Sequence, residues 1–311
     1  MLRLLSRRLI AAGVLLVVIT AVTFLLTSLV PDPTLHVLGA TASPEQIALK
    51  RHELGLDRPV TARYLSWLGG AIGGDLGVSW FTGLSVDATI AARLPITLSL
   101  ALIATAVSAA VGVGFGTAAA IRRGWLDRAL QAVSALGFAV PGMWIALLLV
   151  IAFSIHLRWF PATGYVPLAE DPGGWARSLV LPVTAIAAGS VAAVAAQTRN
   201  AVAGVLGQDY VRTLRSRGLP RHTLLRHVLR NAAPAALTVV SLQFIGMLGG
   251  ALVVEQIFAI QGLGTLATSS SSRSDIPVVL GVVVVGVLIV LAVNLAVDLL
   301  VGWLDPKARR R

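Results

Sequence analysis

The sequence predicts an all-α polytopic membrane protein with six transmembrane helices, and three observations lead to this fold class. Hydrophobic residues make up 56% of the 311 residues and charged residues only 13%, whereas a typical soluble domain carries about 25% charge. Several apolar runs approach or exceed the roughly 20 residues that cross a bilayer as a helix. Lys and Arg gather in alternate connecting segments, which is typical of cytoplasmic loops.

The six predicted spans are separated by segments rich in charge, Gly or Pro. The first follows Arg3, Arg7 and Arg8, is too long for the core of a signal peptide and lacks a cleavage site, so we expect an uncleaved anchor. Pro141 interrupts the third span, because proline removes a backbone hydrogen bond and permits a kink. The spans cover about residues 9–30, 95–120, 130–157, 179–198, 235–258 and 278–303.

The placement of positive charge orients these helices. With both termini in the cytoplasm, the cytoplasmic segments hold 17 Lys or Arg and three Asp or Glu, whereas the external segments hold eight and ten, with Glu255 at the outer end of the fifth span counted as external. The net charge of +11 would favour nucleic acid on a soluble chain. Here the cytoplasmic loops account for it, so we expect membrane lipid and no nucleic acid as a partner.

Three regions follow from this topology. Residues 1–30 form the N-terminal tail and first span, residues 31–93 an external amphiphilic segment, and residues 94–311 a five-helix core with a cytoplasmic loop over 199–233. Within the external segment, Ser43 and Gln46 match a capping box that starts a helix ending at Gly55, and later glycines, Gly69-Gly70 included, indicate loop. The segment is either a platform beside the mouth of a pore or a passive spacer.

The sequence has no persuasive catalytic or metal-binding constellation. There is no cysteine, and neither lysine, Lys50 or Lys307, lies in a glycine-rich phosphate loop. His222 and His227 are five residues apart, which misses the i, i+4 spacing of two ligands on one helix face, so an ordinary polar helix is the better interpretation. We therefore expect no cofactor in this chain.

Two polar residues within predicted spans are candidates for the transport pathway or for structural roles. Gln243 lies in the fifth span and Asp298 in the last. An ionisable group inside a span is a functional hypothesis by default. Because Asp298 lies near the cytoplasmic end, where it can reach water or an arginine, structural pairing is the stronger interpretation. We expect Asp298 to be the one ionisable residue of this kind.

The most informative segment is residues 208–234, which reads as helix, sharp turn, helix. Gly218 suits a left-handed helix cap, and Pro220 suits the first turn of the next helix. Val228, with leucines at helical spacing, makes an apolar stripe. A rigid basic elbow of this kind could act as a lever for a soluble partner. The alternative is an amphipathic hairpin held on the membrane by anionic lipid.

This segment resembles the coupling loop of ABC-importer permeases, in the version of the dipeptide/oligopeptide branch. Arg212, Thr213 and Leu214 stand where the general motif has Glu-Ala-Ala, a replacement that is usual in this branch. The resemblance covers nearly the whole chain, in order. It is carried by Asp209 to Leu219 and His227 to Pro234, and by Pro44-Glu45-Gln46-Ile47, Gly74-Asp75-Leu76-Gly77, Phe160-Pro161-Ala162-Thr163-Gly164-Tyr165 and Glu255-Gln256-Ile257-Phe258.

The resemblance implies a type I ABC-importer permease fold in a bacterial plasma membrane. The chain would have no enzymatic activity of its own. It would form half of a translocation pathway for short peptides, with a second homologous permease, two cytoplasmic ATPase subunits that carry ATP and Mg, and an external solute-binding protein. The implied coupling residues are Asp209, Tyr210, Arg212, Thr213, Leu214, Arg215, Gly218, Leu219 and Pro220.

Other functions stay open at this point. Permeases of this branch also serve nickel, glutathione, haem and other small solutes, and the sequence does not discriminate among them. A secondary transporter driven by an ion gradient would show repeat symmetry and buried ionisable groups at the bilayer midplane, neither of which is evident. A membrane scaffold whose basic elbow merely binds a cytoplasmic partner is the third reading.

Overall fold

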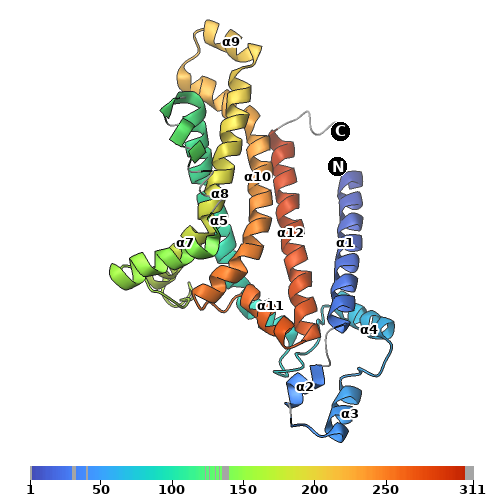
Figure 1. Cartoon of the computed structure of the whole chain (residues 1–311). Helices are drawn as coiled ribbons and strands as arrows, with labels where there is room; N and C mark the ends of the chain where they lie inside the picture. Colours follow the sequence, from blue (N-terminus) through green and yellow to red (C-terminus); the bar gives the residue numbers. More distant parts are fainter. Residues whose placement is uncertain are drawn as a thin grey trace. The chain divides into compact units, whose positions relative to one another are not determined.

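The structure is a computed structural model that describes residues 2–29, 33–39, 41–122, 124–125, 127–129, 131–132, 134 and 140–304 (Figure 1). Within this part of the chain it consists of helices and connecting turns. The helices are α1 (Leu2–Ser28), α2 (Pro33–Leu38), α3 (Pro44–Glu53), α4 (Val60–Ile72), α5 (Val86–Arg122), α7 (Gly142–Leu149), the π-helix η1 (Val150–His156), α8 (Pro172–Leu206), α9 (Asp209–Ser216), α10 (Arg221–Ile257), α11 (Leu263–Ser272) and α12 (Ile276–Leu304).

Five of these helices, α1, α5, α8, α10 and α12, are long and apolar enough to cross a membrane. A shorter apolar helix, Gly142–His156, covers the second half of the predicted third span. It begins directly after Pro141, where the sequence predicts a break. Part of the first half of that span lies outside the described residues. The all-α polytopic fold class is confirmed.

Several helices are longer than the spans predicted from hydropathy. α5 begins at Val86, inside the predicted external segment, and α8 begins at Pro172, inside the predicted loop 158–178. Asp171 explains the second case, since its Oδ1 accepts from the backbone N–H of Gly173 at 2.9 Å and caps α8. At its other end α8 continues to Leu206, beyond the predicted fourth span, whereas the helix, turn and helix predicted over 208–234 are present as α9 and the start of α10.

One predicted loop is helical, and so is part of the segment between the fifth and sixth predicted spans. Gly69 and Gly70 lie inside α4, and the serine-rich stretch after the fifth span forms α11. The hydroxyls of Thr268 and Ser272 donate to carbonyls one turn earlier, at 2.8 and 3.0 Å, so these polar residues fit within a helix. By contrast, the capping box of Ser43 and Gln46 is confirmed, with both of its hydrogen bonds present.

The chain divides into two compact units. The first consists of Met1–Pro95 with Gln261–Leu291. Its apolar clusters join α1, α4 and α12 around Phe24 and Leu280, and α5, α11 and α12 around Val86 and Val278. A buried carboxylate also ties its loops together, since Asp275 accepts from Ser79 Oγ at 2.6 Å and from the N–H of Trp80 at 3.1 Å.

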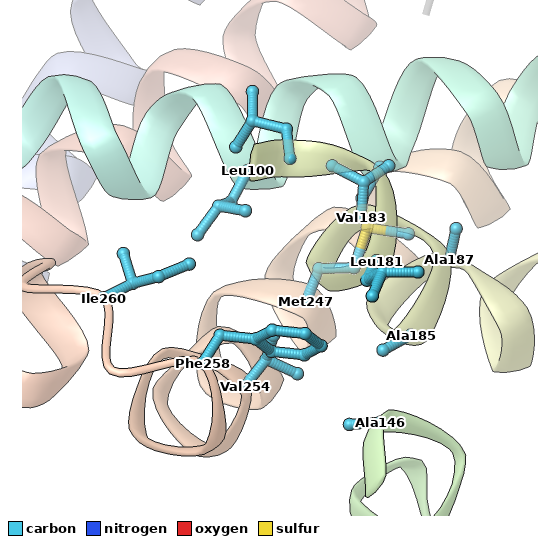
Figure 2. Packing of buried hydrophobic residues seen from close by; sticks show 12 residues of the cluster. Leu100, Ala146, Leu181, Val183, Ala185, Ala187, Met247, Val254, Phe258 and Ile260 are labelled. Atoms are coloured by element: carbon cyan, nitrogen blue, oxygen red, sulfur yellow. The ribbon is translucent and has the colours of Figure 1, made fainter. Parts of the chain in front are cut away.

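The second unit consists of Ile96–Ile260 with Ala292–Arg311. Its largest apolar cluster gathers Leu100 of α5, Leu181 and Val183 of α8, Met247 of α10 and Phe258, which caps the end of α10, around one another (Figure 2). Tight packing of α8 against α10 and α7 surrounds this cluster. This unit contains the candidate site.

Close packing of α5 on α8 depends on two glycines one helical turn apart. A Cβ on Gly112 would lie 2.8 Å from the Val194 side chain. A Cβ on Gly116 would collide with the carbonyl oxygen of Ala195 and lie 2.8 Å from Thr198 Cβ. Small residues at this spacing let two helix backbones approach closely within a membrane.

Candidate functional site

The predicted elbow begins where α8 ends. Gly207 caps α8, Gln208 turns the chain, and α9 starts at Asp209, whose negative charge suits a helix N-terminus. Val211 points inward and is fully buried, and Leu214, one turn later, is partly buried. The opposite face of α9 is exposed. Figure 1 shows α9 at the shared end of α8 and α10.

The turn between α9 and α10 has the form expected from its glycine. Gly218 has φ +72°, in the left-handed region that residues with a Cβ resist. Its N–H donates to the carbonyl of Arg215 at 3.0 Å, and the N–H of Leu219 donates to that of Leu214 at 3.4 Å. This pair of bonds is a Schellman motif, and the partly buried Leu214 and Leu219 occupy the positions of its hydrophobic contact.

Pro220 differs slightly from the prediction. It is the N-cap of α10, with φ −63° and ψ 147°, and the first turn of α10 begins at Arg221. The extended conformation of Pro220 reverses the chain, because proline cannot continue the preceding helix. A Schellman turn followed by a proline therefore gives the elbow a defined angle with few freely rotating residues.

An apolar cluster attaches the elbow to the membrane helices. Buried side chains come from α5, α8, α9 and α10, and they are Ala120, Val202, Val205, Val211, Val228 and Ala232. A hydrogen bond adds to this packing. Asn231 Nδ2 of α10 donates to Tyr210 Oη of α9 at 2.9 Å and to the carbonyl of His227 at 3.0 Å. The elbow and the ends of three membrane helices thus form one packed body.

The outer surface of the elbow is strongly basic. Six exposed arginines occupy it, and Asp209 is the one acid of residues 208–234. Within the described ranges, no carboxylate lies within 4.0 Å of any of these arginines. They are Arg212, Arg215, Arg217, Arg221, Arg226 and Arg230. The surface is therefore available to an acidic partner or to anionic lipid.

The structure brings the predicted loop residues together, and it adds two. Arg212, Thr213 and Arg215 are exposed, whereas Tyr210 is partly buried. The prediction omitted Val211 and Asn231, which hold α9 in place. The i, i+3 spacing of Val211 and Leu214 indicates that Val211 lies on the buried face of the helix. The sequence has no such signal for Asn231, because its partner Tyr210 is 21 residues away.

Gln243 lines a cavity of about 580 Å³ among α7, α8 and α10. Two methionines, Met143 and Met247, and several glycines are also in its wall. A Cβ built on Gly246 or Gly250 would meet no atom within 4 Å, so these glycines border open space and do not serve a tight helix contact. The cavity has the apolar lining with few polar groups that ligand sites favour.

The expectation that Asp298 is the one ionisable residue within a span is wrong. Glu255, near the end of α10, is fully buried, and Thr97 Oγ1 donates to its Oε1 at 2.7 Å. Asp298 is exposed on α12 and is not part of the cavity wall. The fifth predicted span did contain Glu255, and its burial depends on α5, which the sequence pattern could not align with it.

Two protein-family models match this chain and together cover nearly all of it. Residues 110–310 match the family described as the binding-protein-dependent transport system inner membrane component, and residues 1–101 match the N-terminal region of such membrane components.

Individual relatives are similar over almost their full length. The chain is 40% identical to a putative peptide transport system permease protein of Brucella abortus, with 98% of each chain covered. It is 33% identical to the oligopeptide transport system permease protein AppB of Bacillus subtilis, with 97% of each covered, and 33% identical to the dipeptide transport system permease protein DppB of Escherichia coli, with 94% of each covered.

Among solved structures, the fold is similar to that of a chain of the MetNI methionine ABC transporter in an inward-facing conformation. The TM-score is 0.56 at 14% identity, with 70% of this chain and 96% of that chain covered. At this identity the similarity concerns the fold.

Proposed function

Because the chain belongs to the family of inner membrane components of binding-protein-dependent transport systems, we propose that its elbow couples ATP hydrolysis on partner subunits to peptide import. The chain is a multi-pass permease subunit of the bacterial plasma membrane and has no ATPase site of its own. Peptide is the substrate class, since the relatives found across its full length are peptide transport permeases.

The observation that carries the coupling role is the packing of the elbow. Val211 and the bond between Asn231 and Tyr210 join α9 to the membrane helices. A force on the exposed arginines would therefore pass to α8 and α10 as a rigid-body movement. Such a movement biases a two-state bundle, as ligand-driven switches do. An amphipathic hairpin on lipid would need an apolar face free of the protein, but the apolar face of α9 is buried.

The complex that this role requires has four further components or domains. We propose one homologous permease, two ATPases that bind ATP and Mg, and one external solute-binding protein that delivers a short peptide, with this chain supplying half of the pathway. The cavity around Gln243 is our candidate for its share of that pathway. Its uncharged wall accommodates peptides of varied side chain, and Gln243 can hydrogen-bond a peptide backbone.

The test is Gly218→Val in the assembled importer. Valine has a branched Cβ that resists φ +72°, so the turn should change direction although nothing obstructs the side chain. We expect the permease to remain in the membrane and ATP hydrolysis to continue, but peptide uptake into proteoliposomes to fall. Gly204→Val is the matched control, because Gly204 also has open space around it but lies within α8.

Normal uptake by Gly218→Val would contradict the lever role of the elbow. Uptake that requires an ion gradient, and no ATP, would contradict the importer itself and favour a secondary transporter.

A further inference from the structure

The first unit contains a pocket of about 300 Å³ that the import function does not explain. Phe24 of α1, Trp67 of α4 and Ile276 of α12 supply part of its apolar wall. Two arginines, Arg58 and Arg63, also line it. A pocket that combines aromatic side chains with two cations has the chemistry of a site for an amphiphilic anion.

Among the described residues, the two arginines of this pocket have no close carboxylate partner to neutralise their positive charge. Arg63 is partly buried, with its guanidinium carbon 5.5 Å from the centre of the Phe24 ring. In the part of the chain that the structure describes, no carboxylate lies within 4.0 Å of Arg58 or Arg63. Burial lowers the pKa of Arg63, and the charge of Arg51 lowers it further. The negative charge of a bound anion would oppose this lowering, because it favours the protonated guanidinium.

The pocket also lies beside the external end of the first membrane-spanning helix. Phe24 is one helical turn from the end of α1 at Ser28, on the side that the charge distribution makes external. Tyr64 packs on Phe24 and donates from Oη to the carbonyl of Val17 at 3.0 Å, and Trp67 lies beside Tyr64. Tyrosine and tryptophan favour the boundary between membrane and water.

The neighbouring surface of α1 is suited to acyl chains. Val22, Leu25 and Leu26 are 51%, 56% and 59% exposed on this helix, next to the turn that contributes Phe24. An anion with hydrocarbon chains could therefore fill the pocket with its charge and cover α1 with its chains. A free inorganic anion would use only the arginines.

We propose that this pocket binds the phosphate group of an external-leaflet phospholipid between Arg58 and Arg63, with the acyl chains along α1. Asp75 is the one carboxylate among the residues that line the pocket. Its Oδ1 accepts from the N–H of Gly77, which keeps the carboxylate near the pocket. A headgroup with an amine, as in phosphatidylethanolamine, matches two cations and one acid.

Native mass spectrometry of the assembled, delipidated importer tests this site by titration with phosphatidylethanolamine. We expect Arg63→Gln to weaken binding by about tenfold or more, because it removes a charge-assisted contact with phosphate. Arg177→Gln is the matched control, since Arg177 is an exposed external arginine outside the pocket. Ser66→Phe should also weaken binding, because Ser66 is an exposed residue of the pocket wall, and Ser66→Ala should not.

Three results would overturn the proposal. Equal binding of diacylglycerol would mean that the phosphate group is not recognised. Displacement of the lipid by millimolar inorganic phosphate would indicate a free-anion site. Unchanged lipid binding by Arg63→Gln, with weaker docking of the solute-binding protein, would assign the pocket to a protein interface. None of these results depends on whether the elbow couples ATP hydrolysis to transport.

Discussion

The contact between α5 and α8 should make one glycine of α5 essential and a neighbouring one replaceable. At Gly116, an alanine Cβ would collide with the Ala195 carbonyl oxygen, lie 2.8 Å from Thr198 Cβ and lie 3.0 Å from the backbone nitrogen of Arg199, so two of its three nearest neighbours are rigid backbone atoms. At Gly114, nothing lies within 4 Å. Gly116→Ala and Gly114→Ala therefore add the same methyl group to the same helix, in opposite environments.

The magnitudes follow from two opposing effects. Overpacking costs about 1–3 kcal/mol when the neighbours are rigid. Alanine gains up to about 1 kcal/mol over glycine in a helix interior. Because the gain from alanine is common to both variants, we expect the free energy of unfolding of Gly116→Ala to be about 1–3 kcal/mol lower than that of Gly114→Ala, which should be as stable as the parent protein or slightly more so.

Reversible unfolding of the purified permease in mixed micelles, followed by far-ultraviolet circular dichroism, would measure both variants. Equal stability of the two would refute the close approach of α5 and α8. A more stable Gly116→Ala would do so as well.

Two further predictions concern the cytoplasmic end and the cavity. Arg199 donates to Asp127 from Nε at 2.9 Å and from Nη2 at 2.7 Å. Arg199→Lys should lose this two-point contact, lower the free energy of unfolding by about 1 kcal/mol and speed protease cleavage between residues 121 and 129. Unchanged cleavage would count against a structural role for this pair. Gly250→Leu should narrow the cavity and reduce peptide uptake severalfold without loss of stability. Gly249→Leu, at the neighbouring position but outside the cavity wall, should leave peptide uptake unchanged. Equal uptake by the two variants would show that the cavity is not part of the pathway.

The positions of the membrane helices were predictable, but their lengths were not. Hydrophobic runs reveal the part of a helix that lies in lipid, and α1 and α12 follow them closely. α8 and α10 continue past the bilayer because Asp171 and Pro220 begin them in polar segments. A hydropathy pattern ends at the headgroups, whereas a helix ends at its caps.

The elbow was predictable to a greater degree than the cavity. Gly218 and Pro220 act through their own backbone conformations, which are local properties, so the turn could be predicted from residue types alone. The burial of Glu255 was missed because it depends on Thr97, which is 158 residues away in the chain. The pocket of Arg63 and Phe24 likewise joins a short external helix to the first span.

The sequence by itself determined the class of protein, its orientation in the membrane and the form of the elbow, because hydropathy, charge asymmetry and turn conformation are local properties. Only the tertiary structure decided which glycines admit a neighbouring helix, which polar residues are buried and where open space remains. Gly116 and Gly250 are the same residue in helices of similar composition, but one faces the backbone of α8 and the other a cavity. That difference arises from packing between distant segments, which no local pattern records.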